Sequence, residues 1–403
     1  NAYNVRLGGA SNSIAGASAT TFSNTGLVTI NGTTTFANGL THTAGLTTIG
    51  GATTATLGNV SLGGATVNGS LTASAGGVSA GATSLSGSIS GSTGVGLSSL
   101  TANGTSDSVG SGAGSVSTGA ITIADSNTLS LSAGTAINTG SITGANANAT
   151  AGTTSNVSFN AGGVVTVAGA VGTDIGTVTL TTSDGTAFQS TVNAATVTIV
   201  DTAATKTVDF QGNLTVTTGM TVTGTTNAYN VALRGTTNSI AGTTTFGNTG
   251  TLALGDGGDA LAFTGGVVAT APSSKTVNGT VSAAGIGVIN LGTTAVSVAG
   301  NSTIGGTSTG QITLFDTTLA DGVTLTLGAG AATPISATTI DNTTTANSSS
   351  LTINTAGIAT ISGAVGGTQP LNTLTVTQSD GTVFASTVNA ATVTIVDTAA
   401  TKT

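Results

Sequence analysis

The stretch Gly255–Phe263, which reads GDGGDALAF, holds the residues with the clearest capacity for metal chemistry. Carboxylate oxygens are the ligands that Ca²⁺ prefers, and the stretch fits most of the Gly- and Asp-rich nonapeptide that binds calcium in repeat proteins. Asp259 takes the ligand position of that pattern, and Asp256 supplies a second carboxylate. A working site needs the motif on consecutive turns, whereas here it occurs once. Asp256 and Asp259 are therefore candidate calcium ligands, with an Asp-Gly turn as the alternative interpretation.

The remaining chemical inventory is sparse. The 403 residues include five basic residues, thirteen acidic residues, one His and no Cys, and the net charge is −8. His42 has no second His, Glu or Cys to form a metal set, so we expect it to face solvent or lie in a turn. Polysaccharide lyases built as β-helices cluster Asp, Lys and Arg around a groove, and five scattered basic residues do not supply such a cluster. We therefore expect no enzyme and, calcium aside, no cofactor.

The charge also bears on partners and on location. A net charge of −8 repels phosphate, which argues against a nucleic-acid partner. The longest apolar stretch, GGVVTVAGAVG at 162–172, is too short and too often broken by Gly and Thr to span a membrane as a helix. No basic and apolar leader begins the sequence, so we expect any export signal to lie outside these residues.

The elements that position these residues are predicted to be strands. Glu is absent and Lys and Arg are rare, so the best helix formers are missing. Thr and Val favour strands, and the 63 Gly together with Asn favour turns. Disorder is the competing interpretation, but disordered chains are usually charged and poor in aliphatic residues, whereas the mean hydropathy here is +0.38. The composition predicts an all-β protein.

Two long phrases recur along the chain. NAYNVRLGGASNSIAG at Asn1 returns as NAYNVALRGTTNSIAG at Asn227, an offset of 226. STVNAATVTIVDTAATKT at 190–207 returns unchanged at 386–403, an offset of 196. The difference places about thirty extra residues in the first copy, between residues 60 and 112. We divide the chain into repeat units 1–226 and 227–403, the second truncated before the joining coil, and interpret it as a window from a longer tandem array.

Strand spacing predicts the architecture. After the first copy of the 18-residue phrase the sequence continues VDFQGNLTVTTGMTVTG, in which apolar residues alternate with Thr. The inward candidates of successive strands start at Val197, Val208, Leu214 and Met220, so three short strands complete one coil. We expect a parallel β-helix with about three strands per coil, about eighteen coils and one continuous rod, in which the extra residues form further coil. The predicted inward residues are Val197, Ile199, Val208, Phe210, Leu214, Val216, Met220 and Val222.

The phrases GNLTVTTGMTVTG at 212–224 and GGVVTVAGAVG at 162–172 resemble those of large bacterial β-strand-repeat surface proteins. That group includes filamentous-haemagglutinin-like adhesins and the β-helical passengers of autotransporters, and surface-layer proteins of Gram-negative bacteria are similar in composition. The resemblance covers the whole chain and lies in composition and rhythm. It implies secretion, a place on the cell surface, and a structural or adhesive role.

The expected function is a structural repeat segment of a secreted surface filament or adhesin. Its expected partners are other copies or repeats of itself and a cell-surface or glycan receptor. Neither end carries the caps, charges or prolines that normally block a strand edge, which favours assembly into a fibre. The alternatives are a surface-layer lattice protein and a Thr-rich solenoid that binds ice or another ligand, because runs such as TVTLT and LTVTT array hydroxyl groups on one face.

Overall fold

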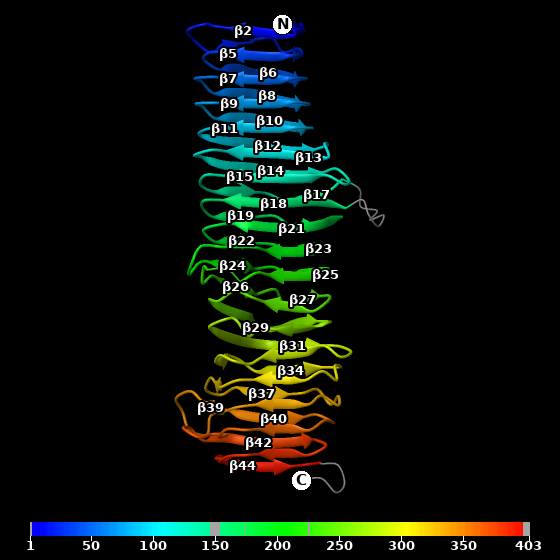
Figure 1. The fold of residues 1–403 in the computed structure, drawn as a ribbon, viewed down its shortest axis with the longest axis vertical. Helices are drawn as coiled ribbons and strands as arrows, with labels where there is room; N and C mark the ends of the chain where they lie inside the picture. Colours follow the sequence, from blue (N-terminus) through cyan, green and yellow to red (C-terminus); the bar gives the residue numbers. More distant parts are fainter. Residues whose placement is uncertain (1, 146–153, 173, 225, 398–403) are drawn as a thin grey trace. The chain divides into compact units, whose positions relative to one another are not determined.

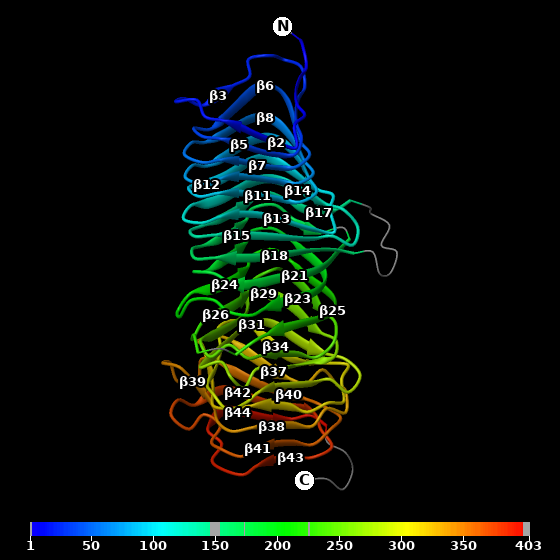
Figure 2. The same ribbon diagram turned by 45° about the horizontal axis from the view of Figure 1, so that its top comes forward.

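The computed structural model describes residues 2–145, 154–172, 174–224 and 226–397. These residues form a β-solenoid of parallel strands in about 17 turns, and the described part of the chain contains no helix. The fold predicted from composition and strand spacing is thus confirmed. The chain divides into two compact units, residues 1–194 and 195–403, and Figures 1 and 2 show the stacked turns of each. This division differs from the sequence repeat, whose second copy starts at Asn227.

The strands of the first unit are short. They are β1 (Val5–Leu7), β2 (Ser11–Ile14), β3 (Thr20–Thr21), β4 (Val28–Ile30), β5 (Thr33–Phe36), β6 (Leu40–Ile49), β7 (Ala52–Ala55), β8 (Val60–Val67), β9 (Ser70–Ala73), β10 (Val78–Leu85), β11 (Ser88–Gly91), β12 (Gly94–Ala102), β13 (Ser106–Ser111), β14 (Ser115–Ile123), β15 (Thr128–Ala133), β16 (Ile137–Thr139), β17 (Ile142–Gly144), β18 (Ser155–Ala161), β19 (Val165–Val167), β20 (Val171–Gly172), β21 (Ile175–Thr182) and β22 (Thr186–Phe188), followed by β23 (Val192–Ile199), which crosses the boundary.

The second unit continues in the same style. Its strands are β24 (Thr207–Phe210), β25 (Leu214–Val222), β26 (Asn230–Leu233), β27 (Thr237–Ile240), β28 (Thr244–Phe246), β29 (Thr251–Phe263), β30 (Gly266–Val268), β31 (Ser274–Ala283), β32 (Val288–Leu291), β33 (Val296–Val298), β34 (Ser302–Gly306), β35 (Ile312–Leu314), β36 (Thr317–Leu319), β37 (Thr324–Leu327), β38 (Ile335–Ala337), β39 (Ile340–Asn342), β40 (Ser350–Asn354), β41 (Ala359–Ile361), β42 (Leu371–Gln378), β43 (Thr382–Phe384) and β44 (Ala390–Ile395).

Each turn in the first unit has three faces, and its longer strands bend around a corner between two of them. In β6, Leu40–His42 pair with the start of β8 and Thr47–Ile49 pair with its end, with a register shift between the two segments. The third face of these turns is built by β5, β7 and β9, which pair in that order. Three strand segments per turn therefore stack on the matching segments of the next turn, as the sequence spacing predicts.

Turn length varies while the register is kept. Val60, Val78 and Val95 pair in succession, although the second of these two turns is one residue shorter than the first. Residues 60–112 are thus stacked turns in the structure. In the second unit, Val231 pairs with Leu252 and Leu252 pairs with Lys275, so the turns there are longer. The corners, not the strands, absorb the differences in length.

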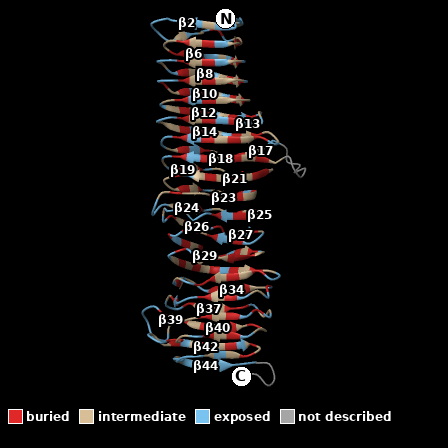
Figure 3. Ribbon diagram, in the orientation of Figure 1, coloured by how far each residue is buried: buried red, intermediate tan, exposed pale blue. Residues whose placement is uncertain are grey.

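The core consists of the inward residues of these strands. Buried and partly exposed residues alternate along most strands, which Figure 3 shows as alternating red and tan segments. All eight residues predicted to point inward, from Val197 to Val222, are at most 3% exposed, so that prediction is confirmed. Each buried aliphatic side chain of this kind contributes about 1.5–3 kcal/mol. Aromatic rings also stack between turns, as in Phe246 and Phe263, whose centroids lie 6.2 Å apart in an edge-to-face arrangement.

Close backbone packing at the corners requires Gly at some positions. A Cβ atom placed on Gly81, within β10, would lie 1.8 Å from the carbonyl oxygen of Gly63 on the previous turn. By contrast, a Cβ on Gly96 in β12 would meet no atom within 4 Å. Only some of the many Gly residues are therefore needed for the stack itself. The described ranges contain no helix with the length and apolar character needed to cross a membrane.

Candidate functional site

The two predicted calcium ligands lie in one loop-like bulge within β29. Gly255 and Gly258 adopt positive φ angles of 83° and 87°, which places a turn inside the long strand. The carboxylate of Asp259 is buried and accepts a hydrogen bond of 2.8 Å from the backbone N–H of Asp256. Asp259 therefore closes the turn over its own backbone, which is the geometry of the Asp-Gly turn interpretation.

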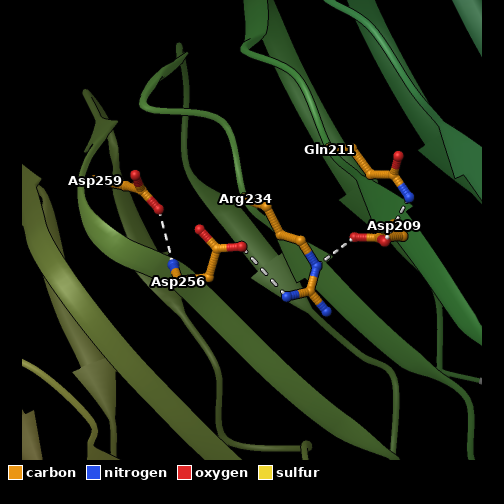
Figure 4. Close-up of polar contacts among 5 residues, drawn as sticks. All are labelled: Asp209, Gln211, Arg234, Asp256 and Asp259. Carbon is orange, nitrogen blue, oxygen red and sulfur yellow. Dashed lines mark hydrogen bonds and ion pairs between the residues drawn. The ribbon is translucent and has the colours of Figure 1, made fainter.

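Asp256 points instead towards a neighbouring turn, where it meets Arg234 (Figure 4). The Arg234 guanidinium lies 3.5 Å from the Asp256 carboxylate and donates a 2.8 Å hydrogen bond from Nε to Asp209. Gln211 donates a further bond of 3.1 Å to the other oxygen of Asp209. Asp209, Arg234 and Asp256 thus form a charged row across β24, the end of β26 and β29.

The charged row shifts the pKa of its central residue. Partial burial lowers the pKa of Arg234, but the hydrogen bond to Asp209 and the charges of both carboxylates outweigh burial and raise it. The side chains of Arg234 and Asp256 remain 41% and 49% exposed, so each contact is screened by solvent and is worth about 1 kcal/mol or less. The two ion pairs of Arg234 thus connect three turns at the surface.

Calcium binding at Asp256 and Asp259 stays a prediction. The structure brings the two residues together in one turn but directs their carboxylates to different partners, a backbone N–H and a guanidinium. Within the described ranges, no three His, Cys, Asp or Glu side chains gather so as to hold a metal ion. The observed contacts are those of a turn and an ion pair.

The expectation for His42 is wrong, because its side chain is buried inside the first unit. The ring Nδ1 lies 2.8 Å from the hydroxyl of Thr47, and Nε2 lies 3.0 Å from the carbonyl oxygen of Asn24. Phe22 packs edge to face against the ring, with centroids 6.3 Å apart. Both ring nitrogens thus have hydrogen-bond partners in neighbouring parts of the stack. These bonds offset the free-energy cost of burying a polar ring. The alternation Leu40, Thr41, His42 already placed His42 inward.

Lys275 is a buried amine that sequence reasoning missed. It is 1% exposed and occupies an inward position of β31, in register with Leu252 below and Val296 above. Its neighbour Val277 is inward as well, so the alternation in SKTV was the signal that could have revealed it. An ammonium group thus lies in a column of inward side chains whose adjacent members, Leu252 and Val296, are apolar.

The amine is satisfied by oxygen acceptors from the adjacent corners. Nζ donates to the carbonyl oxygens of Ala269 at 3.2 Å and Gly292 at 3.4 Å, and to the hydroxyl of Thr294. None of these acceptors carries a charge, and burial lowers the pKa of Lys275 to about 8. The site can therefore lose its proton within a mildly alkaline range.

Asp321 gathers hydroxyl groups from the next turn at one exposed corner. Its carboxylate accepts hydrogen bonds from the hydroxyls of Thr345 at 2.6 Å, Thr344 at 2.8 Å and Ser348 at 3.1 Å, and from the backbone N–H of Thr345 at 3.1 Å. These bonds, the one from the Thr345 hydroxyl first, hold the pKa of Asp321 well below its usual range. The carboxylate is thus fully engaged in holding its own corner.

The outer surface of the second unit carries two parallel columns of hydroxyl groups. In four successive turns, a Thr-x-Thr or Ser-x-Thr pair points outward and pairs in register with its neighbours. The pairs are Thr324 and Thr326, Ser350 and Thr352, Thr373 and Thr375, and Thr392 and Thr394. Strands lie ~4.8 Å apart and alternate residues ~6.7 Å apart, so the hydroxyls form a regular grid without charge.

A shallow groove of about 350 Å³ lies on the first unit, over the outward residues of β8, β10, β12 and β14. Ser61, Ser79, Gly96 and Ser117 form its floor in register. None of its lining residues is titratable, so the groove supplies no general acid, general base or charged anchor.

Comparison with known proteins gives no relative: no family model, no curated protein and no solved structure matches the chain. The stacked fold, the outward hydroxyl columns and the local contacts are therefore the observations on which a functional proposal rests.

Proposed function

We propose that the chain is a structural repeat segment of a secreted bacterial surface filament or adhesin. The observation that carries this proposal is the turn-on-turn pairing, in which nearly every strand segment serves to bury the turn beside it. Polar side chains also connect neighbouring turns. The charged row, the Asp321 carboxylate and the Lys275 amine each form hydrogen bonds or ion pairs with residues of an adjacent turn or corner. A chain whose contacts mainly join adjacent turns is suited to act as a spacer or fibre, because each coil there contacts only its neighbours.

The outer surface supports the same proposal. Outward positions are mostly Thr, Ser and Asn, and the charged residues are few, with five Lys and Arg and thirteen Asp in the whole chain. Such a surface is well hydrated and weakly repulsive, which permits long assemblies to pack side by side. A turn that lies between two others also resists unfolding, because its strands are covered on both sides.

Localisation and shape test the proposal together. Antibodies raised against the purified chain should label intact source cells in immunogold electron microscopy, and the labelled material should be a thin fibre. The axial repeat should equal one unit of about 200 residues, on the order of 40–50 Å at ~4.8 Å per turn. Label confined to the cell interior, or compact globular particles, would contradict the proposal.

Ice binding is a second candidate, favoured by the hydroxyl grid at Thr324–Thr394. An uncharged array of hydroxyls that repeats in register from turn to turn suits a periodic ligand such as an ice face more than a single small molecule. The purified chain should then show thermal hysteresis, which Thr352→Lys in the middle of the grid should abolish while Thr166→Lys, an outward residue of the first unit, leaves it intact. Absence of hysteresis in the parent chain dismisses this candidate.

A further inference from the structure

Asn and Gly recur at one corner of the first unit, where successive turns stack in register. The backbone N–H of Asn68 donates a 2.8 Å hydrogen bond to the carbonyl oxygen of Ile49, and that of Asn103 donates one of 2.6 Å to Leu85. In successive turns, the residues at this place in the corner are Asn31, Gly50, Asn68, Ser86 and Asn103. Each of them is followed by a Gly.

The stack itself requires the Gly that follows Asn68. A Cβ atom placed on Gly69 would lie 2.4 Å from the carbonyl oxygen of Gly51 on the previous turn. Residues with a side chain are therefore excluded from this place. The main-chain nitrogen after Asn68 consequently has no side chain beside it to hinder the approach of the Asn68 carboxamide.

Asn68 and Asn103 are both exposed, but their hydrogen bonding differs. Nδ2 of Asn103 donates a 2.8 Å bond to the hydroxyl of Ser84, and the N–H of Gly104 donates one of 2.8 Å to the Asp107 carboxylate. Asp107 is 1% exposed, so the second bond is shielded from water. Among the described residues, neither the Asn68 side chain nor the Gly69 N–H has a hydrogen-bond partner.

The other Asn-Gly pairs of the described chain are more restrained than Asn68 and Gly69. Nδ2 of Asn38 donates to the carbonyl oxygen of Gly16. The N–H of Gly279 donates a 3.1 Å bond to the hydroxyl of Ser302, and Asn31 is half-buried. The combination of an exposed carboxamide and an unbonded following N–H therefore belongs to Asn68.

We propose that Asn68 is a site of self-modification, at which the folded chain converts the side-chain carboxamide to a carboxylate. The nitrogen of Gly69 loses its proton and bonds to Cγ of Asn68. The bond from Cγ to the amide nitrogen breaks, and this nitrogen leaves with the proton as ammonia. Water then opens the succinimide ring by breaking one of its two C–N bonds, which gives Asp or isoaspartate. Water is the co-reactant, and nothing is oxidised or reduced.

The corner position makes the products compatible with the fold. Asn68 is exposed, so a carboxylate there stays hydrated. Isoaspartate lengthens the backbone by one methylene group, and the corners of this stack already differ in length. Each conversion adds one negative charge to the net charge of −8, so the chains should become more acidic with time. This inference is independent of the proposed function.

The experiment incubates the purified folded chain in mildly alkaline buffer made with heavy-oxygen water, followed by proteolysis and mass spectrometry. The oxygen label separates conversion during the incubation from conversion that preceded it. The carboxyl product should form at least ~tenfold faster at Asn68 than at Asn103, because the bond from Gly104 to a charged acceptor must break before attack. Equal rates, or a faster reaction at Asn103, would overturn the proposal.

Incubation in urea tests that structure sets this order. Residues 67–70 read VNGS and residues 102–105 read ANGT, so the two sites should react at similar rates once the chain is unfolded. A difference that persists unchanged in urea would assign the order to local sequence and overturn the structural reason.

Asn68→Ser is the matched variant, because Ser86 occupies the same place one turn further on. This variant should fold as the parent does and should lose the label from the peptide that contains residue 68. Label that remains in this peptide would place the reaction at another residue and contradict the proposal.

Discussion

Replacing Lys275 by Met should change the pH dependence of stability in a direction that the buried amine fixes. In the folded chain the pKa of Lys275 is lowered by burial from 10.5 to about 8. Between these two values the unfolded chain binds more protons than the folded chain, so the free energy of unfolding rises with pH. The penalty for burying the charged amine is complete below pH 8 and absent above pH 10.5.

The magnitude follows from the width of that window. A difference of about 2.5 pKa units at ~1.4 kcal/mol per unit gives about 3 kcal/mol of stability that Lys275 gains from pH 8 to 10.5. The Lys275→Met variant has no amine to titrate, so its free energy of unfolding does not rise in this way. The free energy of unfolding of the variant minus that of the parent should therefore fall by about 3 kcal/mol from pH 8 to 10.5. The substitution also removes the bonds from Nζ to Ala269, Gly292 and Thr294, of which the parent amine can keep only two when it loses its proton.

Urea denaturation followed by circular dichroism at several pH values between 7 and 10.5 measures the difference. Groups that titrate in both proteins cancel when variant and parent are compared at each pH. Leu252→Met is the control, since it places Met in the same column one turn below and removes no titratable group. A difference between Lys275→Met and the parent that stays constant from pH 7 to 10.5 would refute the reasoning.

Three further substitution experiments test the stack. Ile199→Ala should cost about 2–5 kcal/mol because the side chain is 1% exposed, whereas Ile286→Ala, at a corner and 86% exposed, should cost less than about 1 kcal/mol; equal losses in urea denaturation would contradict the assigned core. Gly81→Ala should lower the thermal midpoint because its Cβ would collide with the previous turn, and Gly96→Ala should not; the reverse order would count against the register. Arg234→Met removes two contacts and should cost about 2 kcal/mol or less at low salt and less than that at ~1 M salt, and a loss of the same size at both salt concentrations would show that the charged row is not screened.

Alternation was sufficient to predict the fold and the inward residues. The apolar and Thr alternation from Val197 to Val222 predicted both the strands and the side of each strand that faces the core, because the side-chain period of a strand is two. That the chain forms one continuous rod stays a prediction, as do secretion and the surface location.

The polar residues inside the stack could not be assigned in the same way. The alternation placed His42 and Lys275 inward, yet polarity argued for solvent, and the sequence does not state which acceptors the adjacent turns supply. For His42 these are Thr47 in its own strand and Asn24 on the previous turn. For Asp256 the deciding partner is Arg234, on another turn. Contacts between turns depend on corner lengths, which vary and carry little sequence signal.

The variable corners have a consequence for how such a chain can change over generations. The turn from Leu252 to Lys275 is longer than the turn from Val78 to Val95, and the pairing of β29 with β31 shifts register once, between Leu254 and Asp259, while the segments on both sides of the shift stay paired. An insertion or deletion at such a bend therefore leaves the core residues in place. A single-residue insertion within a short strand would instead turn its apolar side chains to solvent. Length polymorphism is therefore expected to concentrate at corners, and gain or loss of a whole turn to be better tolerated than a shift of one residue within a strand.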